Sequence, residues 1–145
     1  MGHDDDIHCL AIDPTGKYCA TGQIGPKPWL FVWDNTTMEC VARIQGTLLK
    51  GVKNVAFSND GKFLAASAMD DDHTIAIYDW ATKPKDGKTY KPLASGKGTR
   101  AIILSLGFNP TGDTLIATCV KEVNFFTFDG GIIKGSKGIG WGTNP

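Results

Sequence analysis

Two clusters of histidine and aspartate could in principle hold a metal ion. They are His3-Asp4-Asp5-Asp6 near the start of the chain and Asp70-Asp71-Asp72-His73 in its middle. Calcium loops carry their ligands at alternate positions, with a glycine at the sharp turn and a glutamate at the end, and neither cluster follows that order. Adjacent aspartates in a turn also direct their carboxylates apart. The sequence therefore favours turns over metal sites, and it predicts no metal and no cofactor.

Motifs typical of an enzyme are also missing from the sequence. Residues 130–142 are rich in glycine and lysine, but they lack the lysine and the serine or threonine that directly follow the last glycine of a phosphate-binding loop. We interpret them as a connector. The three histidines, His3, His8 and His73, have no spacing typical of a catalytic triad. We therefore expect no catalytic residues and a protein that is not an enzyme.

The most prominent charge feature lies between residues 83 and 100, where one aspartate stands among six basic residues. The basic residues are Lys83, Lys85, Lys88, Lys91, Lys97 and Arg100. A run of this kind is most often a solvated surface; the functional alternative is a contact with an acidic protein partner. Nucleic acid is a poor candidate, because Tyr90 is the only aromatic residue within the run that could stack on bases. In the whole chain, 15 basic residues also balance 15 acidic ones.

The four cysteines, Cys9, Cys19, Cys40 and Cys119, form no CxxC pair and lie in apolar runs. Neither a disulfide framework nor a zinc site fits that spacing, so we expect reduced thiols packed as small apolar side chains. No apolar run approaches the roughly 18 residues of a membrane-spanning helix, and the first residues do not resemble a signal peptide. We expect a protein of the cytoplasm without membrane contact.

The elements that position these residues are marked by a turn that occurs three times. Asp13-Pro14-Thr15-Gly16 is followed by Asn59-Asp60-Gly61 and Asn109-Pro110-Thr111-Gly112, at intervals of about 45 to 50 residues. An alternating apolar run precedes each turn. About 17 residues after each turn comes an aromatic residue followed by aspartate: Trp33-Asp34, Tyr78-Asp79 and Phe128-Asp129. A period of this length is typical of propellers and other repeat folds.

Each repeat is predicted to form four antiparallel strands, because runs rich in aromatic and β-branched residues alternate with turn residues. The expected strands are residues 7–12, 17–21, 29–34 and 38–44, then 52–57, 62–68, 74–79 and 90–95, then 101–108, 114–119, 122–128 and 130–134. No helix is expected. The predicted fold class is all-β, with units at residues 2–50, 51–99 and 100–135 and a connector at 136–145.

Gly2-His3 and Trp33-Asp34 resemble the ends of the WD repeat, the blade of many β-propellers. In that family a histidine, a strand hydroxyl, a turn aspartate and the tryptophan nitrogen form a hydrogen-bonded chain. The resemblance implies these roles for His3, Thr21 and Trp33 in the first unit. Because no aspartate stands in residues 23–28, that chain is expected to be incomplete.

In the second unit the resemblance implies roles for Ser67 and Asp72, with Tyr78 in place of tryptophan. The third unit, with Phe128, keeps little of the pattern. Both residues lack the indole N–H, so the network is expected to weaken along the chain.

A more specific resemblance covers nearly the whole chain. Residues 2–12, Ala20-Thr21-Gly22-Gln23 and Tyr78-Asp79-Trp80 are similar to the first blades of the echinoderm microtubule-associated protein-like family. That family implies a non-enzymatic role in binding tubulin or microtubules, at the cytoskeleton or in cilia. The alternatives are an adaptor for other proteins and, less favoured, a propeller that binds a small ligand.

Three blades are too few for a closed propeller, which takes typically four to eight. The two end faces of a three-blade stack would leave apolar surface exposed. We therefore expect a fragment of a longer chain, a ring completed by self-association, with two copies giving six blades, or a part of a larger assembly.

Overall fold

The structure forms the three tight turns that the sequence predicts, one in each unit, between its first two strands. Gly16, Gly61 and Gly112 adopt left-handed backbone conformations with φ of 77°, 73° and 78°, which glycine adopts without steric cost. The residue three positions earlier is Asp13, Ser58 or Asn109, and its carbonyl accepts the glycine N–H at 2.9–3.0 Å. Its side chain accepts a second backbone N–H five residues ahead, at 2.9–3.0 Å. Different residue types thus make the same turn three times.

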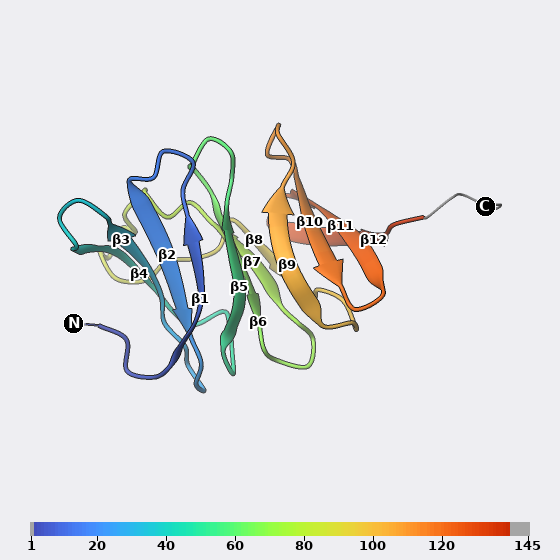
Figure 1. The fold of residues 1–145 in the computed structure, drawn as a ribbon, viewed down its shortest axis with the longest axis horizontal. Helices are drawn as coiled ribbons and strands as arrows, with labels where there is room; N and C mark the ends of the chain where they lie inside the picture. Colours follow the sequence, from blue (N-terminus) through green and yellow to red (C-terminus); the bar gives the residue numbers. More distant parts are fainter. Residues whose placement is uncertain (1, 140–145) are drawn as a thin grey trace.

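The structure is a computed structural model that describes residues 2–139, and within that range it contains twelve strands and no helix (Figure 1). The first unit comprises β1 (Ile7–Ile12), β2 (Tyr18–Gln23), β3 (Leu30–Asp34) and β4 (Cys40–Ile44). The second comprises β5 (Val52–Phe57), β6 (Leu64–Ala68), β7 (Ile75–Tyr78) and β8 (Ala94–Gly96). The third comprises β9 (Ile103–Phe108), β10 (Thr114–Cys119), β11 (Glu122–Asp129) and β12 (Ile132–Lys137). The all-β fold is confirmed.

Most strands begin and end within two residues of the predicted bounds, and two strands differ by more. β8 begins at Ala94 instead of Tyr90, because Pro92 has no N–H for a ladder and Tyr90 instead packs between the first two units. β12 extends to Lys137, into the segment predicted as a connector. Residues 138 and 139 follow outside any strand, and residues 140–145 of the predicted connector lie outside the described part of the chain.

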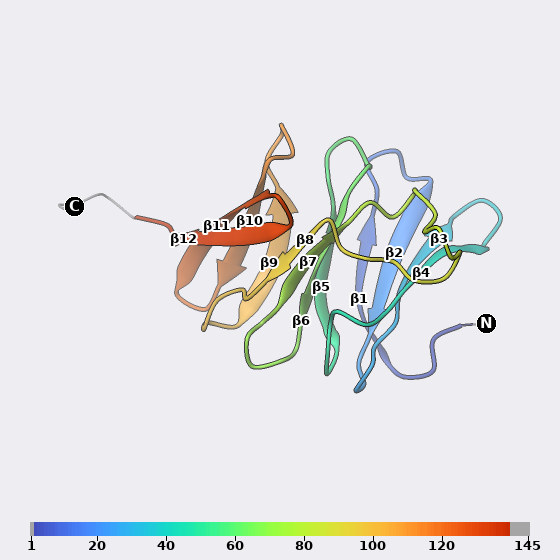
Figure 2. The ribbon, with the colours of Figure 1, turned by 180° about the vertical axis from the view of Figure 1, so that it is seen from behind.

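The twelve strands form two hydrogen-bonded sheets. β1-β2-β3-β4 is an antiparallel meander by itself, whereas β5 to β8 and β9 to β12 are joined into one sheet in the order β5-β6-β7-β8-β12-β11-β10-β9. The junction is a parallel bridge between Ser95 of β8 and Ile132 of β12. Figure 2 shows this junction between the outermost strands of neighbouring units.

The three units stack side by side as the blades of a propeller. Their first strands, β1, β5 and β9, lie next to one another on one side of the stack (Figure 1). A cluster of buried residues from β2, β3 and β4 packs on β5, β6 and β7, and a second cluster joins the second blade to the third. Gly22 permits the first contact, since a Cβ there would lie 2.6 Å from the side chain of Val52.

Both ends of the stack leave apolar side chains exposed, as predicted for three blades. On β1, Leu10 and Ile12 are 62% and 61% exposed. On the third blade, Val123 and Phe125 of β11 are 40% and 42% exposed. These two faces have no neighbouring blade within the described residues.

Candidate functional site

A chain of hydrogen bonds ties the N-terminal segment to the second and third strands of the first blade. The indole Nε1–H of Trp33 donates to Thr21 Oγ1 at 2.8 Å. Thr21 Oγ1 lies 2.7 Å from His3 Nε2, and His3 Nδ1 lies 2.8 Å from Gln23 Oε1. The structure therefore brings together the three residues that the WD resemblance selects in this unit.

Gln23 occupies the place for which the sequence offers no aspartate. Its side chain is buried, its amide donates to Asp4 Oδ1 at 2.6 Å and to the carbonyl of Ile24 at 3.2 Å, and its Oε1 faces His3. Because an amide oxygen can only accept, His3 Nδ1 carries the proton, and His3 Nε2 accepts the hydroxyl of Thr21. The hydrogen-bonded network was expected to be incomplete for want of an aspartate, but the side-chain oxygen of Gln23 accepts the His3 N–H in its place.

Aromatic rings pack beneath this chain on the same face of the blade. The His3 and Phe31 rings lie 4.4 Å apart, and Trp29 and Trp33 contact Phe31 at 5.4 and 5.7 Å. The Arg43 guanidinium lies 5.9 Å from the Phe31 ring, in cation–π range. Phe31 is only 2% exposed as a result. The N-terminal segment thus covers part of the outer face of the first blade.

The second blade does not reproduce this chain, because Ser67 lies on the wrong face. Thr21 shares the face of Trp33, but Ser67 pairs with Ile75, on the face opposite Tyr78. Since side chains alternate along a strand, a shift of one residue reverses the face. Ser67 accepts instead from Asn54 Nδ2 at 3.0 Å, and Asn54 also donates to the carbonyl of Ile103, linking the second blade to the third.

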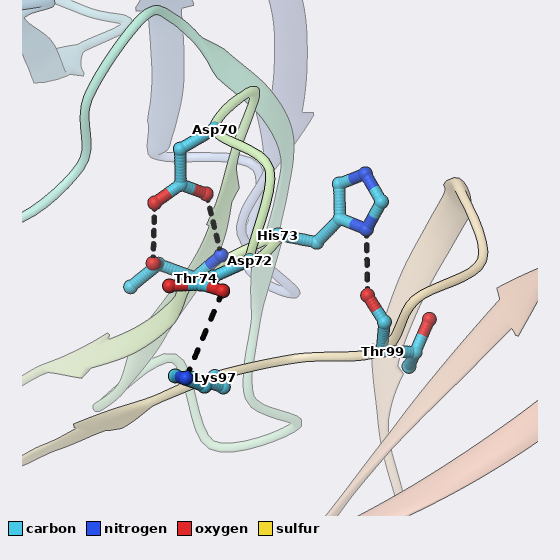
Figure 3. A network of polar contacts seen from close by, with 6 residues as sticks. All are labelled: Asp70, Asp72, His73, Thr74, Lys97 and Thr99. Carbon is cyan, nitrogen blue, oxygen red and sulfur yellow. Dashed lines mark hydrogen bonds and ion pairs between the residues drawn. The ribbon is translucent and has the colours of Figure 1, made fainter.

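Asp72 belongs to a separate group of polar contacts at the β6–β7 turn (Figure 3). Its carboxylate lies 3.9 Å from Lys97 Nζ, and its carbonyl accepts the N–H of Gly98 at 3.0 Å. Asp70 accepts both the N–H and the hydroxyl of Thr74, at 2.8 and 2.6 Å. The structural roles at this turn therefore fall to several residues, of which the sequence selected only one.

His73 in the same turn adopts φ of 47° and donates from Nδ1 to the carbonyl of Thr99 at 2.6 Å (Figure 3). The contact fastens the turn to the segment that leads into β9. Between residues 2 and 139, no group of three or more histidine, cysteine, aspartate or glutamate side chains is placed to share a metal ion. Of the acidic residues of this turn, Asp70 accepts from backbone and hydroxyl donors, whereas Asp71 and Asp72 pair with Lys50 and Lys97.

The six basic residues selected as a partner-binding run do not form one surface. Four of them, Lys83, Lys85, Lys88 and Lys91, lie on the long loop between β7 and β8. Lys97 pairs with Asp72 beyond the end of β8, and Arg100 follows two residues after Gly98. The structure thus divides the run into a loop group and a group near the β6–β7 turn.

The β7–β8 loop is anchored by aromatic side chains at both ends. The Trp80 ring packs on Tyr18 and Phe57 at 4.8 and 6.0 Å, and its Nε1–H donates to the carbonyl of Gly61 at 3.0 Å. Tyr90 is 9% exposed and belongs to the core between the first two blades. Lys83 Nζ reaches the carbonyl of Val41 on β4 at 3.2 Å. The loop therefore crosses from the second blade to the outer strand of the first, as Figure 2 shows.

All four cysteines are free thiols, and two of them, Cys9 and Cys119, pack in the apolar clusters between the blades. Cys9 lies in the interface with β5, where its Sγ donates to the carbonyl of Val52 at 3.4 Å. Burial raises the pKa of the Cys9 thiol to about 11. A thiol with so high a pKa is a poor nucleophile at neutral pH. The described residues also contain no helix long and apolar enough to cross a membrane.

Comparisons with known proteins agree with this architecture. The profile of the family described as WD domain, G-beta repeat matches residues 1–34 and 38–79. The β-propeller domain of Cps50 (Swd1) from Myceliophteria thermophila superposes with a TM-score of 0.72, covering 94% of this chain and 39% of that one at 15% sequence identity. The first finding confirms the WD resemblance, and the second confirms the propeller fold.

Two relatives carry the more specific resemblance. Echinoderm microtubule-associated protein-like 2 of Mus musculus is 30% identical over 96% of this chain, which covers 22% of that protein. Echinoderm microtubule-associated protein-like 4 of Xenopus tropicalis is 31% identical over 96% of the chain, which covers 16% of that protein. The chain therefore spans about a fifth of the length of the curated relatives that it matches.

Proposed function

This chain belongs to the WD domain, G-beta repeat family, and from that premise we propose that it is a non-enzymatic scaffold that binds tubulin or microtubules. The observation that carries the proposal is the similarity to echinoderm microtubule-associated protein-like proteins over 96% of the chain. The name of those proteins associates them with microtubules, and we extend that association to this chain.

The mechanism would be adhesive. Rigid meanders hold the loops that join them, and binding residues on such loops need little ordering when a partner arrives. The hydrogen bonds of His3 with Thr21 and Gln23 make the first blade rigid, and the β7–β8 loop supplies four lysines. An acidic protein surface, such as that of tubulin, would meet those lysines with complementary charge.

An adaptor for other proteins is the second candidate. The observation that favours it is that the chain covers only 22% and 16% of the two relatives. The association with microtubules that their names state therefore need not reside in the part that this chain matches. A cytoplasmic, cytoskeletal location follows from the first proposal. A ciliary location has no support in the structure or in the relatives' names and is not proposed.

We also propose that the exposed end faces are covered by further blades or by a second copy of the chain. Val123 and Phe125 on one end, with Leu10 and Ile12 on the other, supply the apolar surface for such contacts. Association through these faces would extend the stack toward a complete ring.

The test of the proposed function is co-sedimentation of the purified chain with stabilised microtubules. We expect the chain to pellet with microtubules in a saturable, salt-sensitive manner, because contacts between exposed charges are screened by ions. A chain that stays in the supernatant at low salt would favour the adaptor. Bovine serum albumin serves as the control for trapping in the pellet.

A further inference from the structure

We propose that the β7–β8 loop forms a binding groove for a short acidic peptide segment of a protein partner. The inference rests on the proposed function only in assuming that the partner is a protein. An apolar side chain of the peptide would lie against Tyr90 and Leu93, and its carboxylates would face Lys85 and Lys91.

The groove is a hollow of about 500 Å³ within the loop itself. Its apolar surface comes from Pro84, Tyr90 and Leu93, and Leu93 is 46% exposed. Lys85 and Lys91 line the same hollow. A second hollow of about 450 Å³, lined by Lys88 and Tyr90, adjoins it toward β4. Apolar surface bordered by cations is the arrangement that an acidic peptide with one large apolar residue would complement.

The lysines of the loop are available to a partner. The ion pairs found within residues 2–139 are Lys50–Asp71 and Lys97–Asp72, and neither involves a loop lysine. In the part of the chain that the structure describes, Lys83 is the one loop lysine whose ammonium has a hydrogen-bond partner, the carbonyl of Val41. The positive charges beside the groove are therefore not neutralised by ion pairs among the described residues.

The two aspartates that also line the groove are held by donors of the loop. Asp86 accepts the N–H groups of Thr89 and Lys88, each at 2.8 Å, and these bonds lower the pKa of its carboxyl to about 2. Asp79 accepts the hydroxyl of Thr82 at 2.8 Å. Both carboxylates thus shape the loop and do not pair with its lysines.

The same aspartates favour a peptide over nucleic acid. A continuous phosphate backbone would pass close to two fixed negative charges, and Tyr90 is the single aromatic in the groove, with its ring largely buried in the core. Single-stranded nucleic acids bind to series of exposed aromatic rings. A peptide can instead space its carboxylates to avoid Asp79 and Asp86.

The groove is also preorganised. Trp80 and Tyr90 fix the two ends of the loop in the core between the blades, and Lys83 contacts β4 between them. A fixed loop loses little conformational entropy on binding. The groove can therefore bind a short segment without a large contact area.

The experiment is fluorescence anisotropy with the full 145-residue chain and a fluorescein-labelled peptide, SEEFEES. Two matched peptides replace phenylalanine by alanine or all glutamates by glutamine. We expect saturable binding of the first peptide and weaker binding of both matched peptides. The K85A/K91A variant should bind the first peptide about tenfold more weakly, as the loss of two exposed charge contacts implies.

A matched variant, K134A/K137A, removes the same charge from β12 and should bind like the wild type. L93S should weaken the phenylalanine peptide and leave the alanine peptide unchanged. Urea midpoints equal to that of the wild type establish that each variant is folded.

Several results would overturn the proposal. They are unchanged affinity in K85A/K91A, equal losses in both double variants, or tighter binding of a twelve-nucleotide oligothymidine than of the peptide. Peptide binding without microtubule pelleting would keep the groove and remove tubulin as its partner. Pelleting without peptide binding would overturn the groove and leave the proposed function standing.

Discussion

The two ends of the blade stack differ in how their outer faces are closed. On the first blade, His3 and Gln23 bring the N-terminal segment over Phe31, which is 2% exposed. On the third blade, Phe125 occupies the outward face of β11 and is 42% exposed. A blade can thus cover part of the face that the first blade turns outward with its own polar network. The opposite face, which the third blade turns outward, is covered only when another blade packs on it.

The largest expected effect sharpens this comparison directly. Phe31→Ala removes a buried ring that packs on three other rings, and we expect it to lower the free energy of unfolding by about 3–5 kcal/mol. Phe125→Ala removes a half-exposed ring and should cost about 1 kcal/mol or less. Urea titrations monitored by circular dichroism measure both. Similar losses would show that the N-terminal segment contributes nothing special to the first blade.

The next effect tests the polar chain itself. Gln23→Leu would leave the Nδ1–H of His3 and the carboxylate of Asp4 without their partner, so we expect a loss of about 2 kcal/mol. The matched variant is Asn124→Leu in the third blade, where the buried amide contacts only Glu122 and the thiol of Cys119. We expect a smaller loss there. If Asn124→Leu lowers the free energy of unfolding more than Gln23→Leu does, the polar network around Gln23 is not the more stabilising of the two.

The sequence predicted the repeats well because turn chemistry is local. A left-handed glycine and a side-chain acceptor three residues earlier are enough to form each hairpin, so the three turns and nearly all strands could be placed. The start of β8 and the parallel bridge between Ser95 and Ile132 could not be predicted from the sequence, because they depend on packing between blades.

The candidate site was less predictable because it depends on strand register. By pairing, the third-blade counterpart of Trp33 is Phe126, opposite Leu115, and not Phe128, because the loop before β11 is short. Ser67 was selected one residue away from Ala66, the true counterpart of Thr21. Motif spacing alone does not resolve such shifts, and one residue decides which face a side chain joins.

The third prediction concerns the exposed face of the third blade. Phe125→Ser should change the free energy of unfolding by about 1 kcal/mol or less, but it should weaken self-association through that face. Sedimentation velocity over a concentration series measures the effect, with Met38→Ser, at an exposed turn of the first blade, as the control. Unchanged association of Phe125→Ser would exclude this face as the contact, and a wild-type chain that stays monomeric would leave only further blades to cover it.

The smallest effect compares the same turn in two blades. Burial opposes ionisation of Asp13, but the N–H of Tyr18 and the hydroxyl of Thr15 outweigh it, so the pKa of its carboxyl is lowered below 3.8. A carboxyl with a depressed folded pKa stabilises the fold above its unfolded pKa, and the contribution is lost as the pH falls through the folded value. The wild type should therefore exceed Asp13→Asn in stability at pH 7, and the difference should shrink below about pH 4.

The third blade reverses the preference, from a carboxylate to an amide. Asn109 occupies the position of Asp13, and its amide donates to Asp113 Oδ1 at 2.6 Å. Asn109→Asp would set two carboxylates against each other, so this variant should be less stable than the wild type at pH 7 and recover part of the loss on acidification. Urea midpoints of both variants between pH 7 and about pH 3 measure the two trends. Both variants should therefore be less stable than the wild type at pH 7 and approach it on acidification. An Asn109→Asp variant as stable as the wild type at pH 7 would show that Asp113 does not disfavour a carboxylate at this position.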